Sequence, residues 1–203
     1  MSDAQQLPVE WSSAGTALEQ ESGDVHVVAG FPHGALVAVI DGLGHGVEAA
    51  EAAKEAARIL ESLPGESLPT LVQRCHEALR KTRGAVMSIA SFDSQQSSLT
   101  WMGVGNVEGI LLRAGRSEKG PTEAITLRGG VVGYQLPPLR PSLLSVSPGD
   151  TLVMATDGIR SGFVADLRMH GSPEEMAQSI LARHARGTDD ALVLVARYLG
   201  ATP

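Results

Sequence analysis

The chain has 203 residues, of which 43% are hydrophobic and 19% charged, a balance typical of one globular domain spanning residues 1–203. The formal net charge is −7 and no basic patch is evident, so nucleic-acid binding through phosphate neutralisation is not expected. No signal peptide and no run of about 18 apolar residues is present, which predicts a soluble, cytoplasmic protein without a membrane partner. The single cysteine, Cys75, excludes an internal disulfide and is expected to be a buried, unreactive thiol.

The first half of the chain predicts strands followed by two amphipathic helices. In chain order the strands are expected at 9–14, 24–29 and 35–40, and the helices at 46–60 and 68–79. Pro32, His33 and Gly34 make a tight connection between the second and third strands, which predicts a hairpin. That hairpin would place Asp24, at the start of one strand, beside Asp41, at the end of the other.

The second half predicts mainly strands. They are expected at 86–92, 99–103, 107–113, 124–127, 143–146, 150–155 and 191–198. The two strands on either side of Pro148 and Gly149 are expected to pair with each other. The segment 129–141 is rich in glycine and proline, which rules out a central strand and fits either a substrate-recognition flap or an irregular connection.

One further helix precedes the last strand. Ser172 and Glu175 have the spacing of a capping box, Pro173 stands at the first turn, and Gly187 marks the end. The chain therefore runs through strands, two helices, many strands, one helix and one strand. This order predicts an α+β fold with mainly antiparallel sheets, because a doubly wound fold would alternate strands and helices regularly.

Acidic residues recur at the ends of the expected strands. Asp24 and the pair Asp189 and Asp190 open strands, whereas Asp41 and Asp157 close strands directly before a glycine. Because starts and ends of antiparallel neighbours lie at one edge, these carboxylates could meet there. Packed carboxylates repel one another unless cations neutralise them. No cysteine or histidine pair accompanies them, so the oxygen donors favour Mg²⁺ or Mn²⁺ over zinc.

The stretch from Asp41 to Gly46 (DGLGHG) fits two kinds of ligand when taken alone. A buried strand that ends in a carboxylate and turns over three glycines could hold either a metal ion or a phosphate. The later acids favour cations, because they would be badly placed around a bare anion. Asp41 could then bridge two ions about 4 Å apart. Any one Asp-Gly pair is most often only a turn, so the hypothesis depends on the ordered set.

Two polar residues near these acids have open roles. His45 could protonate a leaving serine or threonine oxygen, or could only fix the turn by hydrogen bonding. Gly105 and Asn106 are expected to form a tight turn near the site, with a direct role for Asn106 left open.

Three sequence motifs, taken in chain order, resemble those of the metal-dependent type 2C (PPM) serine/threonine phosphatases. They are most similar to the bacterial branch containing SpoIIE and RsbU. The matching stretches are 41–46, 155–159 (ATDGI) and 189–195 (DDALVLV), and the resemblance covers nearly the whole chain. The stretch 102–107 (MGVGNV) before a further strand, and the absence of a sensor domain, are similar to a stressosome phosphatase of that branch. The resemblance implies an αββα sandwich of two mainly antiparallel sheets flanked by helices.

The resemblance also implies a centre of two Mn²⁺ or Mg²⁺ ions at one edge of the sandwich, with a third ion left open. The residues that it places at the metals are Asp24, Asp41, the Gly42 carbonyl, Asp157, Asp189 and Asp190. Asp41 would bridge both ions. Asp189 matches the family's metal ligand better and Asp190 the Asn or Asp that follows it, but both are kept because a shift by one residue is not excluded. The phosphate-holding arginine of larger eukaryotic relatives has no counterpart before Arg58.

The implied reaction is direct hydrolysis of phosphoserine or phosphothreonine by water activated between two ions, with His45 as the candidate acid. The implied substrates are phosphorylated STAS-domain proteins of a bacterial stress-signalling complex, the stressosome, so the enzyme would reset a signal. A monomer is expected. Two alternatives stay open: a catalytically inactive binding module of the same fold, and a phosphohydrolase acting on small phosphoesters.

Overall fold

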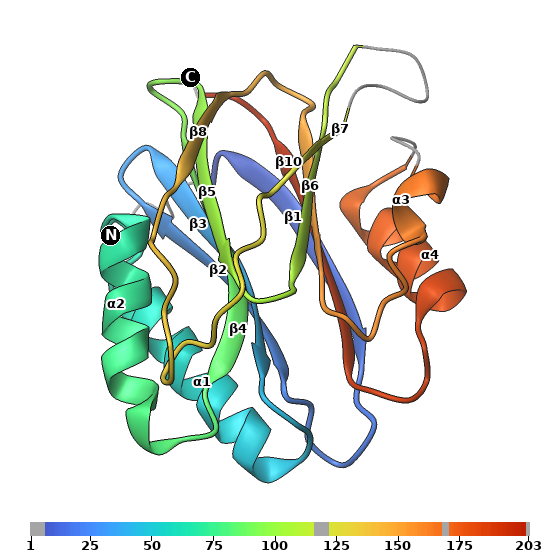
Figure 1. The fold of residues 1–203 in the computed structure, drawn as a ribbon. Helices are drawn as coiled ribbons and strands as arrows, with labels where there is room; N and C mark the ends of the chain where they lie inside the picture. Colours follow the sequence, from blue (N-terminus) through green and yellow to red (C-terminus); the bar gives the residue numbers. More distant parts are fainter. Residues whose placement is uncertain (1–6, 116–121, 168–170, 202–203) are drawn as a thin grey trace, which may run out of the picture.

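The chain forms a four-layer sandwich in a computed structural model that describes residues 7–115, 122–167 and 171–201. Among these residues, two five-stranded sheets pack face to face, and helices cover both outer faces (Figure 1). All strand pairs within the sheets are antiparallel. The predicted αββα fold class is therefore confirmed. In the described part of the chain, no helix has the length and apolar character needed to cross a membrane.

The first sheet contains the last strand of the chain near one edge. Its order is β1 (Val9–Thr16), β10 (Ala191–Tyr198), β9 (Thr151–Ala155), β6 (Glu108–Leu112) and β7 (Thr122–Ala124). The strand expected at 124–127 lies slightly earlier, as β7. After it the chain turns away from the sheet, because the Arg128 carbonyl accepts a hydrogen bond from the Gly105 amide (2.8 Å).

The second sheet contains the predicted hairpin. Its order is β2 (Asp24–Phe31), β3 (Gly34–Gly42), β4 (Ala85–Asp93), β5 (Ser98–Val104) and β8 (Ser142–Ser145). The turn between β2 and β3 passes through His33 in the left-handed region (φ 64°). The resulting register pairs Asp24 with Asp41, as the sequence predicted.

The predicted pairing of 143–146 with 150–155 is wrong. β8 pairs with β5 and β9 pairs with β10 and β6, so residues 146–150 carry the chain from one sheet to the other. The buried carboxylate of Asp150 holds this crossover by accepting hydrogen bonds from the amides of Ala114 (2.7 Å) and Ser147 (3.1 Å) and by pairing with Arg113. A proline-glycine turn between two apolar runs fits a hairpin as well as a crossover, and the partners of Asp150 are distant in sequence.

The helices α1 (Val47–Ser62) and α2 (Leu68–Ala78) cover the second sheet, and a short 3₁₀ turn, η1 (Leu79–Lys81), follows α2 (Figure 1). The buried face of α1 is largely alanine, which lets the helix approach the sheet closely. Cys75 of α2 is buried, and burial raises the pKa of its thiol to about 12, in agreement with the expected unreactive cysteine.

The helices α3 (Phe163–Asp166) and α4 (Pro173–His184) cover the first sheet. The capping box is present: the Glu175 amide donates to Ser172 Oγ (3.2 Å) and the Ser172 amide to Glu175 Oε2 (2.8 Å). The helix ends at His184, before the expected stop at Gly187. The four residues of α3 were not predicted, because one helical turn is too short to show a period.

Candidate metal centre

Asp41 stands where a fully buried stretch of β3 reaches the edge of its sheet. Residues 35–40 are entirely buried, and the Asp41 side chain is half-buried. Burial raises the pKa of the Asp41 carboxyl to about 8, and repulsion from Asp24, Asp157, Asp189 and Asp190 adds to the increase. An acid so placed favours either a proton or a cation.

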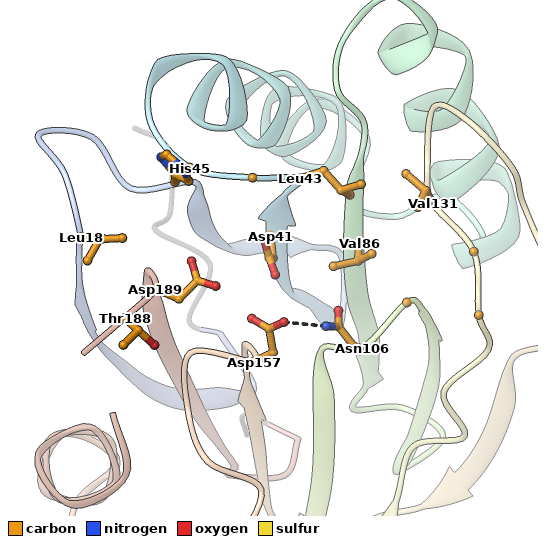
Figure 2. A pocket seen from close by; sticks show the side chains of 14 residues that line it. Leu18, Asp41, Leu43, His45, Val86, Asn106, Val131, Asp157, Thr188 and Asp189 are labelled. Atoms are coloured by element: carbon orange, nitrogen blue, oxygen red, sulfur yellow. Dashed lines mark hydrogen bonds between the residues drawn. The ribbon is translucent and has the colours of Figure 1, made fainter. Parts of the chain in front are cut away.

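A pocket of about 580 Å³ opens at this edge. Figure 2 shows Asp41, Asp157 and Asp189 around it, contributed by the end of β3, the residue pair following β9, and the connection preceding β10. The two sheets thus bring together three of the carboxylates that the sequence predicted to meet. Among the apolar residues that line the remaining wall are Leu18, Leu43, Val86 and Val131.

Asp157 is held by the turn between β5 and β6. Asn106 Nδ2 donates a hydrogen bond to Asp157 Oδ2 (2.8 Å), drawn as a dashed line in Figure 2. Gly105 adopts a φ of 98° that favours glycine, and a Cβ there would lie 2.3 Å from Val86 Cβ. The turn expected near the site is therefore present, and Asn106 contacts a candidate ligand.

Asp24 lies behind the pocket, between the two sheets. Thr156 Oγ1 donates to Asp24 Oδ2 (2.8 Å) and accepts from the Leu192 amide (2.9 Å). Burial raises the pKa of Asp24 to about 7, the bond from Thr156 works against this rise, and the neighbouring acids add to it. Sequence reasoning missed Thr156; its position next to Asp157 at the end of a buried strand was the available signal.

The two members of the acidic pair have different surroundings. Asp189 is exposed and lines the pocket. Asp190 is 3% exposed, and its two carboxylate oxygens accept hydrogen bonds from the amides of Leu18 and Gly23, each at 2.7 Å. Asp190 therefore ties the connection between β1 and β2 to the start of β10.

The glycines after Asp41 and Asp157 are required by close packing. A Cβ at Gly42 would lie 2.1 Å from the Ala49 carbonyl oxygen of α1, and one at Gly158 would lie 1.9 Å from the Asp190 carbonyl oxygen. Gly42 is buried and its amide donates to the Gly23 carbonyl (2.9 Å). It lies beneath the pocket rather than among the residues that line it.

His45 lies at the mouth of the pocket, between two glycines in the left-handed region, Gly44 (φ 91°) and Gly46 (φ 77°). Its Nδ1 is 2.6 Å from Glu19 Oε1, a partner on the β1–β2 connection that sequence reasoning did not identify. Both side chains are exposed. The imidazole is thus held over the pocket by a carboxylate.

The donor set fits hard divalent cations. Three aspartates face the pocket without a cysteine, and the only histidine there is bonded to Glu19. Within residues 7–115, 122–167 and 171–201, no three acidic, histidine or cysteine side chains form a ready-made metal shell. The fit therefore depends on the chemistry and placement of the donors and on the raised pKa of Asp41, because cations would relieve the repulsion.

Two antiparallel sheets flanked by helices are the fold of the PP2C-type phosphatases. The chain belongs to the SpoIIE family, since the family model described as Stage II sporulation protein E matches residues 32–199. Among curated proteins, phosphoserine phosphatase RsbX of Bacillus subtilis (strain 168) is 28% identical over 159 residues, which cover 76% of each chain.

Solved structures agree with this assignment. A structure described as "The bacterial stressosome: a modular system that has been adapted to control secondary messenger signaling" is 33% identical with a TM-score of 0.83, covering 93% of this chain and 99% of the other. RsbX in complex with magnesium is 22% identical with a TM-score of 0.82, covering 93% and 94%. The predicted membership of the SpoIIE branch of the PPM phosphatases, and the likeness to RsbX, are confirmed.

Proposed function

We propose that the chain is a metal-dependent hydrolase that removes phosphate from serine or threonine side chains of proteins. One observation carries the proposal: Asp41, Asp157 and Asp189 come from both sheets and line one pocket in a chain of a phosphatase family. The name of RsbX, phosphoserine phosphatase, supports phosphoserine as a substrate.

We assign the cations, two Mn²⁺ or Mg²⁺ ions, to Asp41, Asp157 and Asp189, with Asp24 and the Gly42 carbonyl behind them. Related structures are described with magnesium for RsbX and with two manganese ions for PstP, which supports this choice. Asp190 serves a different purpose in this proposal, because both of its oxygens already accept backbone hydrogen bonds.

Divalent cations at such a centre supply Lewis acidity toward water and the phosphoryl group. The chain's own residues do the rest. Asn106 orients Asp157, and the apolar side chains of Leu43 and Val131 border the space beside the phosphoester. His45, held by Glu19 at the mouth, donates a proton to the leaving serine or threonine oxygen.

Hydrolysis assays test this function directly. Rates with p-nitrophenyl phosphate and a phosphoserine peptide, each with and without Mn²⁺, should show metal-dependent turnover that Asp41→Asn abolishes. Asp93→Asn is the matched control, because Asp93 lies at the opposite end of the same sheet. Absence of metal-dependent turnover, with wild type no faster than Asp41→Asn, would indicate a binding module without activity. Turnover of small phosphoesters but never of phosphopeptides or phosphoproteins would favour the small-molecule phosphohydrolase.

For the substrate, we propose phosphorylated STAS-domain proteins of a stressosome-like signalling complex in the cytoplasm. The support is the likeness to RsbX and to the stressosome-related structure. The purified chain should dephosphorylate a phosphorylated STAS domain faster than an unrelated phosphoserine protein at equal concentration, measured by phosphate release. Equal rates on both would contradict this substrate class and leave the phosphatase function intact.

A further inference from the structure

Basic residues are concentrated next to the pocket although the chain is acidic overall. Arg80, Lys81 and Arg83 are three of the 16 lysines and arginines in the chain and lie within four residues. All three side chains are exposed. Arg83 pairs with Glu48 of α1, whereas Arg80 and Lys81 have no acidic partner among the residues that the structure describes.

The end of this basic segment lies beside the pocket. The Leu43 amide donates to the Gly84 carbonyl (3.0 Å), which fixes the end of the segment against the turn that follows β3. Arg83 Nη1 lies 2.6 Å from the point where a Cβ on Gly44 would stand. Because Leu43 and Gly44 both line the pocket, the Arg83 guanidinium lies at its edge.

An exposed tyrosine lies on a loop packed against the same segment. A Cβ on Gly133 would lie 2.8 Å from the Leu79 side chain, and the Gly133 amide donates to His76 Nδ1 (3.0 Å). Val131, two residues earlier, lines the pocket. Tyr134 is 85% exposed, more than any other large hydrophobic side chain among the described residues. Tyrosine and arginine are the side chains that protein interfaces favour.

The opposite side of the pocket mouth carries a different charge pattern. There Glu19 is hydrogen-bonded to His45, and Glu21 pairs with Lys54. Arg80 and Lys81, which have no acidic partner among the described residues, lie on the side of η1. A phosphorylated segment entering the pocket would meet this charge beside its phosphate.

We propose that Arg80, Lys81, Arg83 and Tyr134 form a docking surface for an acidic segment of the phosphoprotein substrate, next to the phosphorylated residue. This inference rests on the proposed phosphatase function and adds a selectivity to it. The attraction comes from exposed charges, so it acts through several weak pairs and is screened by salt. The docking surface should therefore strengthen the binding of extended substrates and leave the chemical step unchanged.

The test compares phosphoserine peptides of equal length with acidic residues before the phosphoserine, after it, or on neither side. For wild type with Mn²⁺, kcat/KM should be about tenfold higher for one of the acidic peptides than for the neutral peptide at low salt. Arg80→Glu/Lys81→Glu should remove this preference and leave hydrolysis of the neutral peptide and of p-nitrophenyl phosphate unchanged. Arg140→Glu/Arg183→Glu changes the net charge equally at exposed sites elsewhere and should keep the preference.

Binding measurements separate failure of the docking surface from failure of the proposed function. Fluorescence anisotropy with the labelled acidic phosphopeptide needs no turnover, and its Kd should rise about tenfold in Arg80→Glu/Lys81→Glu. Tyr134→Ala should weaken this binding, whereas Tyr134→Phe should retain it. Equal affinity of wild type for acidic and neutral peptides, or an equal loss in the control double variant, would overturn the docking surface. Absence of hydrolysis with intact selective binding would overturn only the phosphatase function.

Discussion

The carboxylates at the site edge differ in how their charge is compensated. Asp157 accepts a hydrogen bond from Asn106, Asp24 accepts one from Thr156, and Asp190 accepts two from backbone amides. Among the described residues, none donates a hydrogen bond to the carboxylate of Asp41, whose pKa is raised to about 8. Asp41, one of the residues to which the proposal assigns the cations, thus lacks this compensation.

Asn106 acts through Asp157 in this arrangement. Asn106→Ala should weaken Mn²⁺ binding about tenfold, because a carboxylate that loses its positioning hydrogen bond must be ordered by the ion itself. Isothermal titration calorimetry measures the change independently of activity. Thr188→Ala, at a residue that lines the same pocket, is the control and should bind Mn²⁺ like wild type. Equal affinity in Asn106→Ala would show that the hydrogen bond is only part of the turn.

Tyr198 carries a buried hydroxyl group outside the candidate metal site. Its ring stacks on Phe92 between the sheets, and its hydroxyl is buried without a hydrogen-bonding partner among the described residues. Tyr198→Phe should therefore keep the protein as stable or stabilise it by up to about 1 kcal/mol in urea unfolding. Tyr134→Phe, at an exposed position, should leave stability unchanged. A loss above about 1 kcal/mol would reveal a buried water bonded to the hydroxyl.

At the scale of elements, the glycine of each Asp-Gly motif packs against a neighbouring segment: Gly42 against α1 and Gly158 against Asp190. Gly158→Ala should destabilise the protein by about 3 kcal/mol or more, because its Cβ would overlap the Asp190 carbonyl and push the start of β10 away. Gly162→Ala is a matched control in the same segment: no atom lies within 4 Å of its Cβ and its φ is −59°, so stability should be unchanged or higher. Thermal unfolding of both variants decides the matter, and equal melting temperatures would contradict the overlap.

Local signals predicted the elements that depend on local physics. The capping box at Ser172 and the hairpin that pairs Asp24 with Asp41 both follow from residues a few positions apart. The acids at strand ends also predicted which carboxylates would share an edge. Strand partners did not follow in the same way, because the crossover at Asp150 depends on Arg113 and Ala114, more than 30 residues earlier.

The same limit applies to the candidate site. The resemblance favoured Asp189 over Asp190 only by alignment, since the physical difference arises from amides of Leu18 and Gly23 that lie far away along the chain. The basic segment at residues 80–83 was overlooked for a related reason. Arg80, Lys81 and Arg83 look like an ordinary polar helix end until the structure places Arg83 beside Gly44.

At the scale of the whole molecule, the sandwich is fastened at both ends of its sheets. Thr156 and Asp190 join the layers at the site edge, and Arg113, next to β6, donates a hydrogen bond to the Ser145 carbonyl of β8 (2.5 Å) near the other end. The site edge carries the additional strain of crowded acids in a chain of net charge −7. The stability of the whole fold should therefore depend on pH and on divalent cations.

Metal-free protein should lose stability as the pH rises from about 4 to about 8. In this range native Asp41 (pKa about 8) still binds a proton that the unfolded chain (pKa 3.8) has released, so the native state holds more protons and rising pH favours unfolding. Asp24, with a pKa of about 7, contributes in the same direction. At pH 8.5 in EDTA, Asp41→Asn should therefore melt about 5 °C or more above wild type, because the amide cannot ionise.

Divalent cations should reverse the order of the melting temperatures of wild type and Asp41→Asn. Saturating Mg²⁺ at pH 8.5 should raise the melting temperature of wild type, because it binds the native carboxylates and not the unfolded chain. Asp41→Asn should gain much less, and Asp93→Asn, at the far end of the sheet, should respond like wild type. An equal response of all three proteins would place the cations away from Asp41. Equal melting of wild type and Asp41→Asn in EDTA would instead mean that the crowded acids do not strain the fold, and the argument for cations at this edge would lose its electrostatic basis.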